Sequence, residues 1–164
     1  MNFKMGIFGF GGIAKFHCKL INTKIPQITV KGAYDINPEK NADIEEYGLH
    51  IYPDAESLLA DPEIDLILIA TPNNFHKDYA IRAMRAGKHV LCEKPMAKTA
   101  AEAEEFLGSY ESRLNDAGFD RTSPAVAGTN RQIAIYNEER DMVVGVDFTE
   151  QNGGALVNLE FKAR

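Results

Sequence analysis

A glycine-rich turn near the start of the chain has the residue types needed to bind the phosphates of a nucleotide. The run Gly9-Phe10-Gly11-Gly12-Ile13-Ala14 follows a short apolar stretch and opens an apolar segment with helical spacing. In such a turn the first glycine permits a sharp bend, and the second lets the backbone approach a pyrophosphate. The small Ala14 allows the helix to pack closely on the strand, and the N–H groups at the helix start attract phosphates. We therefore predict a dinucleotide site, the alternative being a glycine turn that binds no ligand.

Asp35 indicates which nicotinamide dinucleotide the site prefers. It ends the next predicted strand, where a carboxylate can accept hydrogen bonds from the hydroxyls of the adenosine ribose. The same negative charge would repel the 2′-phosphate of NADP. The sequence therefore predicts NAD as the cofactor, with NADP as the less favoured alternative.

A second candidate loop, Thr71-Pro72-Asn73-Asn74-Phe75-His76, follows the most apolar run of the chain. Ligands of open α/β sheets bind outside the carboxyl ends of the strands, so we expect this loop to line the cofactor crevice. The Asn73 amide could contact a ribose or a carboxamide. His76 lies in a predicted first helical turn, where histidine is more often structural than chemical, and both roles stay open.

The third group is Cys92-Glu93-Lys94-Pro95, again after a predicted strand. Lys94 could polarise or protonate a substrate oxygen if burial and nearby charge adjusted its pKa. Glu93 could orient this lysine or hold a ribose. The alternative is an exposed Glu–Lys pair before a loop proline.

The elements that would position these residues alternate along the first two thirds of the chain. Short apolar runs alternate with amphipathic stretches, which is typical of β-α-β units and a parallel sheet. We predict an α/β fold, a doubly wound Rossmann sheet with helices on both faces. The predicted strands cover 4–8, 29–34, 66–70 and 89–92, with a weaker one near Ile51, and the predicted helices cover 13–21, 41–47, 55–60, 75–86 and 100–114.

The last third of the chain has a different pattern. After residue 114 a polar, turn-rich segment precedes a candidate short strand at 125–129. Alternating apolar residues at 142–149 and 155–162 flank Asn152-Gly153, which predicts a C-terminal antiparallel β-hairpin. Two strands alone cannot bury the apolar face of such a hairpin. We expect a second copy of the chain, in a homodimer, or the chain's own Rossmann helices to cover it.

Composition excludes several classes of function. The net charge of −6 argues against a general affinity for nucleic acid or an anionic membrane, and no run is long enough to cross a bilayer. Cys18 and Cys92 lack the spacing of a zinc site or a disulfide framework, so we predict no metal and a cytoplasmic location. No targeting signal is recognised at the start of the sequence.

Taken together, the motifs resemble those of the Gfo/Idh/MocA oxidoreductases, the family of glucose-fructose oxidoreductase and inositol dehydrogenase. The resemblance runs from about residue 3 to 107 and continues weakly to Arg131, near the end of the family's sixth Rossmann strand. It implies an NAD(P)-dependent oxidoreductase acting on a sugar, polyol or related hydroxy or keto compound. It also implies that Lys94 faces the substrate and assists hydride transfer, that Lys94–Pro95 is a cis bond, and that Glu93 and the Thr71-Pro72-Asn73 loop contact the nicotinamide ribose.

The chain also departs from the family pattern. Family members are about twice as long and carry a second domain with a catalytic histidine, whereas all four histidines here precede residue 90. We predict a Rossmann domain over 1–131 and a remnant of the substrate and dimerisation domain over 132–164. Two functions stay open: an active oxidoreductase, and a nucleotide-binding domain or truncated fragment without turnover.

Overall fold

The computed structural model describes residues 2–99, 101–102, 104–105, 108–109, 112, 120–121, 130–137, 142–151 and 154–163. Contacts divide the chain into two compact units, Met1–Glu93 and Lys94–Arg164. This division falls earlier than the boundary predicted after Arg131.

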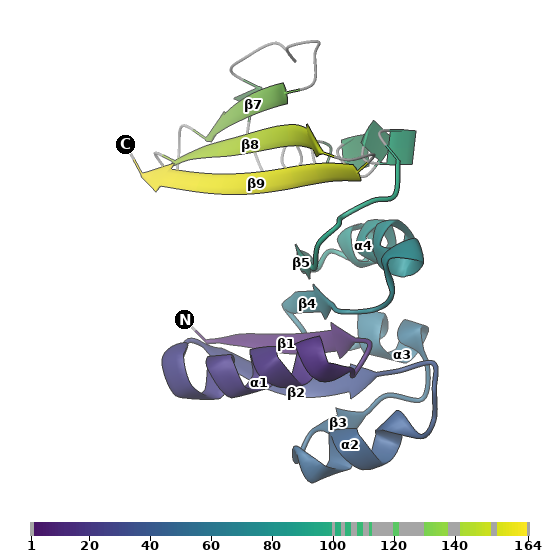
Figure 1. The fold of residues 1–164 in the computed structure, drawn as a ribbon. Helices are drawn as coiled ribbons and strands as arrows, with labels where there is room; N and C mark the ends of the chain where they lie inside the picture. Colours follow the sequence, from purple (N-terminus) through teal and green to yellow (C-terminus); the bar gives the residue numbers. More distant parts are fainter. Residues whose placement is uncertain are drawn as a thin grey trace. The chain divides into compact units, whose positions relative to one another are not determined.

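The first unit is built on a five-stranded parallel sheet with the order β3-β2-β1-β4-β5 (Figure 1). Its strands are β1 (Phe3–Phe8), β2 (Ile28–Tyr34), β3 (His50–Ile51), β4 (Leu66–Ile69) and β5 (His89–Cys92). All the predicted strands of this part are present, the weak one near Ile51 included. The order reverses between β1 and β4, which is where a doubly wound sheet binds its ligands.

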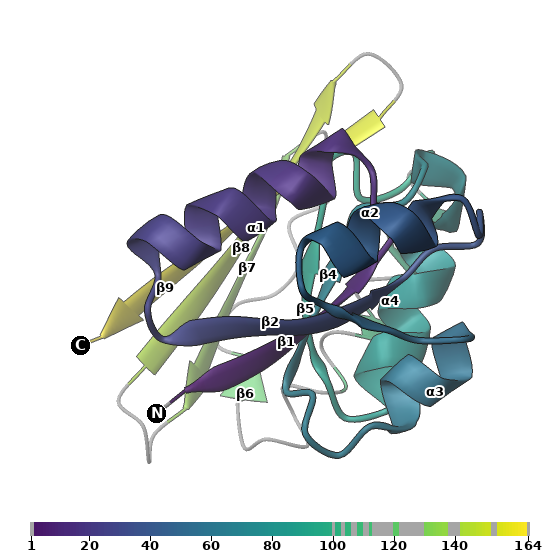
Figure 2. The ribbon, with the colours of Figure 1, turned by 90° about the horizontal axis from the view of Figure 1, so that it is seen from below.

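The helices cover both faces of this sheet. They are α1 (Gly12–Lys24), α2 (Lys40–Glu46), α3 (Ala55–Ala60) and α4 (His76–Arg85), with a short 3₁₀ turn η1 (Asn73–Phe75) before α4. Right-handed crossovers put helices on opposite faces when the strand order reverses. Figure 2 shows this arrangement, with α1 and α2 on one face and α3 and α4 on the other. The predicted doubly wound Rossmann fold is confirmed.

The apolar sequence of each strand is explained by this double cover. On the α1–α2 face, one core cluster joins strands and helices through Met5, Ile7, Phe10, Ala14, Cys18, Ile21, Val30, Ala33, Ile44 and Leu68. In β4, three consecutive residues from Ile67 to Ile69 are fully buried. A run without polar alternation is what a strand covered on both faces requires.

The second unit contains helical residues from 101 onward, followed along the chain by a four-stranded antiparallel sheet. All described residues between 101 and 112 are helical, as predicted, and the Glu102 N–H donates to Thr99 Oγ1 at 3.2 Å, which caps the helix start. The sheet has the order β6-β7-β8-β9, with β6 (Asp120–Arg121), β7 (Asn130–Asn137), β8 (Met142–Gln151) and β9 (Gly154–Ala163).

The sheet of the second unit confirms one expectation and corrects another. Strands β8 and β9 pair in antiparallel register, as predicted, although β7 and β6 extend the sheet beyond a hairpin. Asn130 and Arg131 do not end a sixth parallel strand, because both belong to β7, which is antiparallel to β8 along its whole length. The strand predicted at 125–129 lies outside the described residues. That residues 132–164 are a domain remnant stays a prediction.

Candidate cofactor site

The turn after β1 requires a glycine at its first position. Gly9 has φ +82°, in the left-handed region, and its N–H donates to the Tyr34 carbonyl at 2.8 Å. A Cβ on Gly9 would lie 2.8 Å from the Ala70 carbonyl oxygen and 2.9 Å from the Thr71 nitrogen. The loops after β1 and β4 are therefore in direct contact at the carboxyl edge of the sheet, and Gly9 permits it.

The start of α1 is open for an anion. A Cβ on Gly11 or Gly12 would meet no atom within 4 Å, so the backbone there can be approached closely. Gly11 caps α1 without a side-chain hydrogen bond, and the first turn holds no acidic residue. These features fit a pyrophosphate at the positive end of the helix. In the same turn Phe10 and Ala14 are fully buried in the core, whereas Ile13 is half exposed.

Asp35 fixes the glycine turn as well as ending β2. Its Oδ2 accepts the Phe10 N–H at 2.6 Å, and its Oδ1 accepts the Asn37 N–H at 2.8 Å. Ionised carboxylates offer about four acceptor positions, so both oxygens can still accept a ribose hydroxyl. The sequence suggested only the ribose contact. The structure adds that this carboxylate holds the phosphate-binding loop.

Asp35 also lines a small pocket beside the contacting loops. The pocket is lined by Phe8, Gly9, Tyr34, Asp35, Ile36, Thr71, Pro72, Phe75 and Tyr79. In the described part of the chain, Thr71 Oγ1 is buried and has no hydrogen-bond partner. Buried hydroxyls seldom lack a partner, so this atom is suited to bind a ligand in the pocket. Thr71 and Pro72 thus lie beside the carboxylate expected at the adenosine ribose, not only near the nicotinamide end.

Aromatic rings form the apolar side of this pocket. The Tyr79 ring stacks on Phe8 with centroids 4.5 Å apart and an angle of 26°. The Arg82 guanidinium lies 5.4 Å from the Tyr79 centroid, and burial raises the pKa of the Tyr79 phenol. Sequence reasoning missed Tyr79, although its position four residues after Phe75 on a helix would have placed both rings on one face.

His76 is placed in the interior rather than in the pocket. It is 1% exposed, and its Nε2 lies 2.7 Å from the Thr71 carbonyl oxygen. Of the two roles left open by the sequence, this geometry supports the structural one, in which the ring orients the loop after β4. Asn73 begins η1 at the same edge of the sheet.

Glu93 follows β5 at the carboxyl edge of the sheet. Its N–H donates to the Ile69 carbonyl at 3.0 Å, which extends the β4–β5 ladder. Its Oε1 lies 2.5 Å from Nε2 of His17 on α1, a partner that sequence reasoning did not identify. The Lys94–Pro95 peptide bond is cis, as the resemblance implied.

The cysteines show no sign of reactivity. Burial raises the pKa of Cys18 to about 11 and that of Cys92 to about 12, so both thiols stay protonated at neutral pH. Across the described residues, no group of three or more histidine, cysteine, aspartate or glutamate side chains could hold a metal ion. Within the same residues, no helix combines the length and the apolar character needed to cross a membrane.

Comparisons with known proteins identify the family of this chain. The sequence profile of the Gfo/Idh/MocA family, described as an oxidoreductase family with an NAD-binding Rossmann fold, matches residues 3–115. The chain is 39% identical to glucose-6-phosphate 3-dehydrogenase of Bacillus subtilis (strain 168), over 82% of this chain and 39% of that protein. It is 30% identical to inositol 2-dehydrogenase of Pseudomonas fluorescens (strain SBW25), over 74% of this chain and 38% of that protein.

Solved structures give the same result. An NAD-binding protein from Listeria innocua superposes with a TM-score of 0.66 and 37% identity, over 69% of this chain and 33% of that one. Scyllo-inositol dehydrogenase from Lactobacillus casei, with bound NAD(H) and scyllo-inositol, gives a TM-score of 0.65 and 28% identity, over 70% and 34%. The chain thus spans about two fifths of the length of the two curated relatives named above. With the profile matched over its whole parallel sheet, the chain belongs to the Gfo/Idh/MocA oxidoreductase family and contains that family's NAD-binding Rossmann domain.

Proposed function

We propose that this chain binds NAD(H) and provides the cofactor-binding part of an oxidoreductase that acts on a sugar, a polyol or a related compound. The observation that carries the proposal is the open backbone at Gly11 and Gly12, together with a pocket lined by Asp35 and Thr71. The buried Thr71 Oγ1 has no hydrogen-bond partner among the described residues. The relatives support the substrate class, since they are named for inositol and glucose-6-phosphate.

Each end of the cofactor would meet a different set of residues. The first turn of α1, starting at Gly11, would bind the pyrophosphate through backbone N–H groups. Asp35 would accept the hydroxyls of the adenosine ribose and repel a 2′-phosphate, which favours NAD over NADP. Glu93 would contact the nicotinamide ribose. When bound, the nicotinamide supplies or accepts a hydride at its C4 carbon, and Lys94 would move a proton to or from the substrate oxygen.

A second candidate is a nucleotide-binding protein without turnover. A turnover screen separates the two candidates. Sugars and polyols are offered with NAD, and their keto forms with NADH, while the absorbance of NADH is followed. Oxidation or reduction of any of these compounds supports an active oxidoreductase, whereas tight NADH binding without turnover supports the second candidate.

We also propose a homodimer formed through the sheet of the second unit. The register places apolar residues opposite one another at Val144 and Phe161, Val146 and Leu159, and Phe148 and Val157, and β7 adds Ile135 and Ile133 opposite Val144 and Val146. Residues at alternate positions of paired strands share one face, so this set forms an apolar face across three strands. Large continuous apolar faces are typical of interfaces between subunits. We also propose a cytoplasmic location, as expected from the cysteine pattern.

A further inference from the structure

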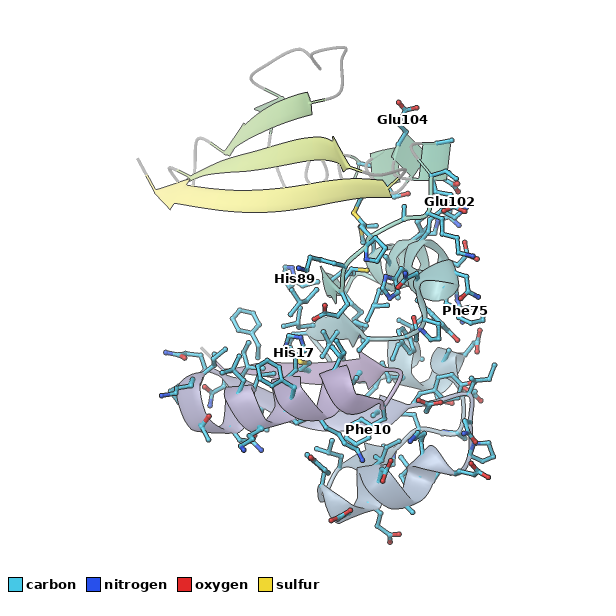
Figure 3. All side chains as sticks on the ribbon, in the orientation of Figure 1. Phe10, His17, Phe75, His89, Glu102 and Glu104 are labelled. Atoms are coloured by element: carbon cyan, nitrogen blue, oxygen red, sulfur yellow. The ribbon has the colours of Figure 1, made fainter. Side chains whose placement is uncertain are left out.

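His17 and Glu93 link α1 to the end of β5 through their side chains. They are separated by 76 residues, and His17 Nε2 lies 2.5 Å from Glu93 Oε1. The side chains are 20% and 24% exposed, so the pair lies near the surface rather than in the core. Figure 3 shows His17 projecting from α1 toward the side of the sheet that carries β4 and β5.

The pair is close to the proposed phosphate site. His17 lies about one and a half turns after the start of α1, which is ~7.5 Å along the helix axis. The Glu93 backbone is fixed by its hydrogen bond to Ile69 on β4, at the same edge of the sheet. Glu93 is therefore held twice, through its backbone by β4 and through its carboxylate by α1.

We propose that His17 is a positioning residue for the cofactor. By holding the Glu93 carboxylate against α1, it orients the carboxylate to accept a hydroxyl of the nicotinamide ribose. The proposal rests on the proposed function, since it requires NAD(H) in this crevice. Partly exposed side-chain pairs of this kind add little to folding stability, so a purely structural role predicts a small effect when His17 is replaced. If His17 instead orients Glu93, its replacement should weaken binding of the nicotinamide half of the cofactor and leave binding of the adenosine half unchanged.

The choice of ligand makes the test specific. NADH contains the nicotinamide riboside, whereas ADP shares the adenosine and the diphosphate but lacks that riboside. We expect His17→Phe to weaken NADH binding about tenfold, as expected when a hydrogen-bonded carboxylate loses its orientation. The affinity for ADP should stay within about twofold. His17→Gln, whose amide N–H can replace Nε2–H, should restore most of the NADH affinity.

Two further variants complete the experiment. His89→Phe changes an exposed histidine at the opposite end of β5 and should leave both affinities unchanged (Figure 3). In a Glu93→Ala background, His17→Phe should cause no further loss of NADH affinity, because its effect passes through that carboxylate. Thermal unfolding of every variant verifies that it is folded.

The outcomes are distinct. If the wild-type chain binds neither NADH nor ADP, the proposed function itself is wrong. If it binds both and His17→Phe weakens them equally, or weakens neither, the positioning role is wrong while the proposed function survives. The positioning role is also wrong if the losses of NADH affinity from His17→Phe and Glu93→Ala simply add.

Discussion

Replacing Gly9 with alanine should destabilise the first unit far more than its single added methyl group suggests. The residue has φ +82°, where an L-residue is strained, and the new Cβ would lie 2.8 Å from the Ala70 carbonyl oxygen. The close atoms are backbone atoms at the end of β4, so no side chain can rotate away. The loops after β1 and β4 would have to separate.

The expected magnitude follows from these two costs. A left-handed conformation costs a non-glycine residue about 1–2 kcal/mol, and overpacking against fixed atoms costs about 1–3 kcal/mol more. We therefore expect Gly9→Ala to lower the free energy of unfolding by about 2–5 kcal/mol. For a unit of this size each kcal/mol lowers the Tm by about 4–8 °C, so the Tm should fall by at least about 8 °C.

Two other glycines provide matched controls. Gly48 has φ +69° but no atom within 4 Å of its Cβ position, so Gly48→Ala should cost only the conformational strain, about 1 kcal/mol. Gly11 has neither positive φ nor close neighbours, so Gly11→Val should leave the Tm nearly unchanged while abolishing NADH binding. Thermal and urea unfolding followed by circular dichroism measures all three. A Gly9→Ala variant as stable as Gly48→Ala would refute the close approach of the two loops.

The remaining predictions concern other parts of the chain. Lys94→Ala should leave the Kd for NADH within about tenfold, or roughly 1.4 kcal/mol, and remove any turnover found; surviving activity would contradict the proton-transfer role. Tyr52→Phe should lower the free energy of unfolding by about 1–3 kcal/mol, since its buried hydroxyl donates to Asp61 at 2.5 Å. Hydrogen bonds from Lys31 and then from Tyr52 lower the pKa of Asp61 from its usual 3.8. The hydrogen bonds to the Asp61 carboxylate therefore stabilise the fold at neutral pH, and this stabilisation is lost as the pH falls below 3.8. Acid unfolding curves that Tyr52→Phe does not alter would contradict the role of this hydrogen bond. Phe161→Asp should convert a dimer to monomers in light scattering without loss of NADH binding, and a wild-type monomer at tens of micromolar would refute the dimer.

The parts that could be predicted from the sequence are those specified by local patterns. The unbroken apolar run of β4 indicated a strand covered on both faces, and the glycine turn after β1 indicated a phosphate-binding loop. Both features depend on residues close together in the chain, where periodicity and turn chemistry are informative. Element boundaries in the first unit accordingly differ from the prediction by only a few residues.

The parts that were missed depend on contacts between distant segments. Nothing near Glu93 in the sequence identifies His17 as its partner, because the two residues meet only once the chain has folded. The sequence predicted a ribose contact for Asp35 but not its hydrogen bond from the Phe10 N–H. That bond depends on how the loop after β1 and the end of β2 come together in the fold. Asn130 and Arg131 were placed in the wrong sheet, since a short strand does not reveal in its sequence whether its neighbour is parallel or antiparallel.

The central claim is that the turn from Gly9 to Ala14 binds NAD(H), with Asp35 selecting it over NADP(H). Calorimetric titration of the wild-type chain with NADH and with NADPH tests this most directly. We expect NADH to bind more tightly than NADPH, and binding of NADH to disappear in Gly11→Val while the variant remains folded. Tighter binding of NADPH would contradict the role of Asp35, and no binding of either dinucleotide by the folded wild-type chain would contradict the cofactor site itself.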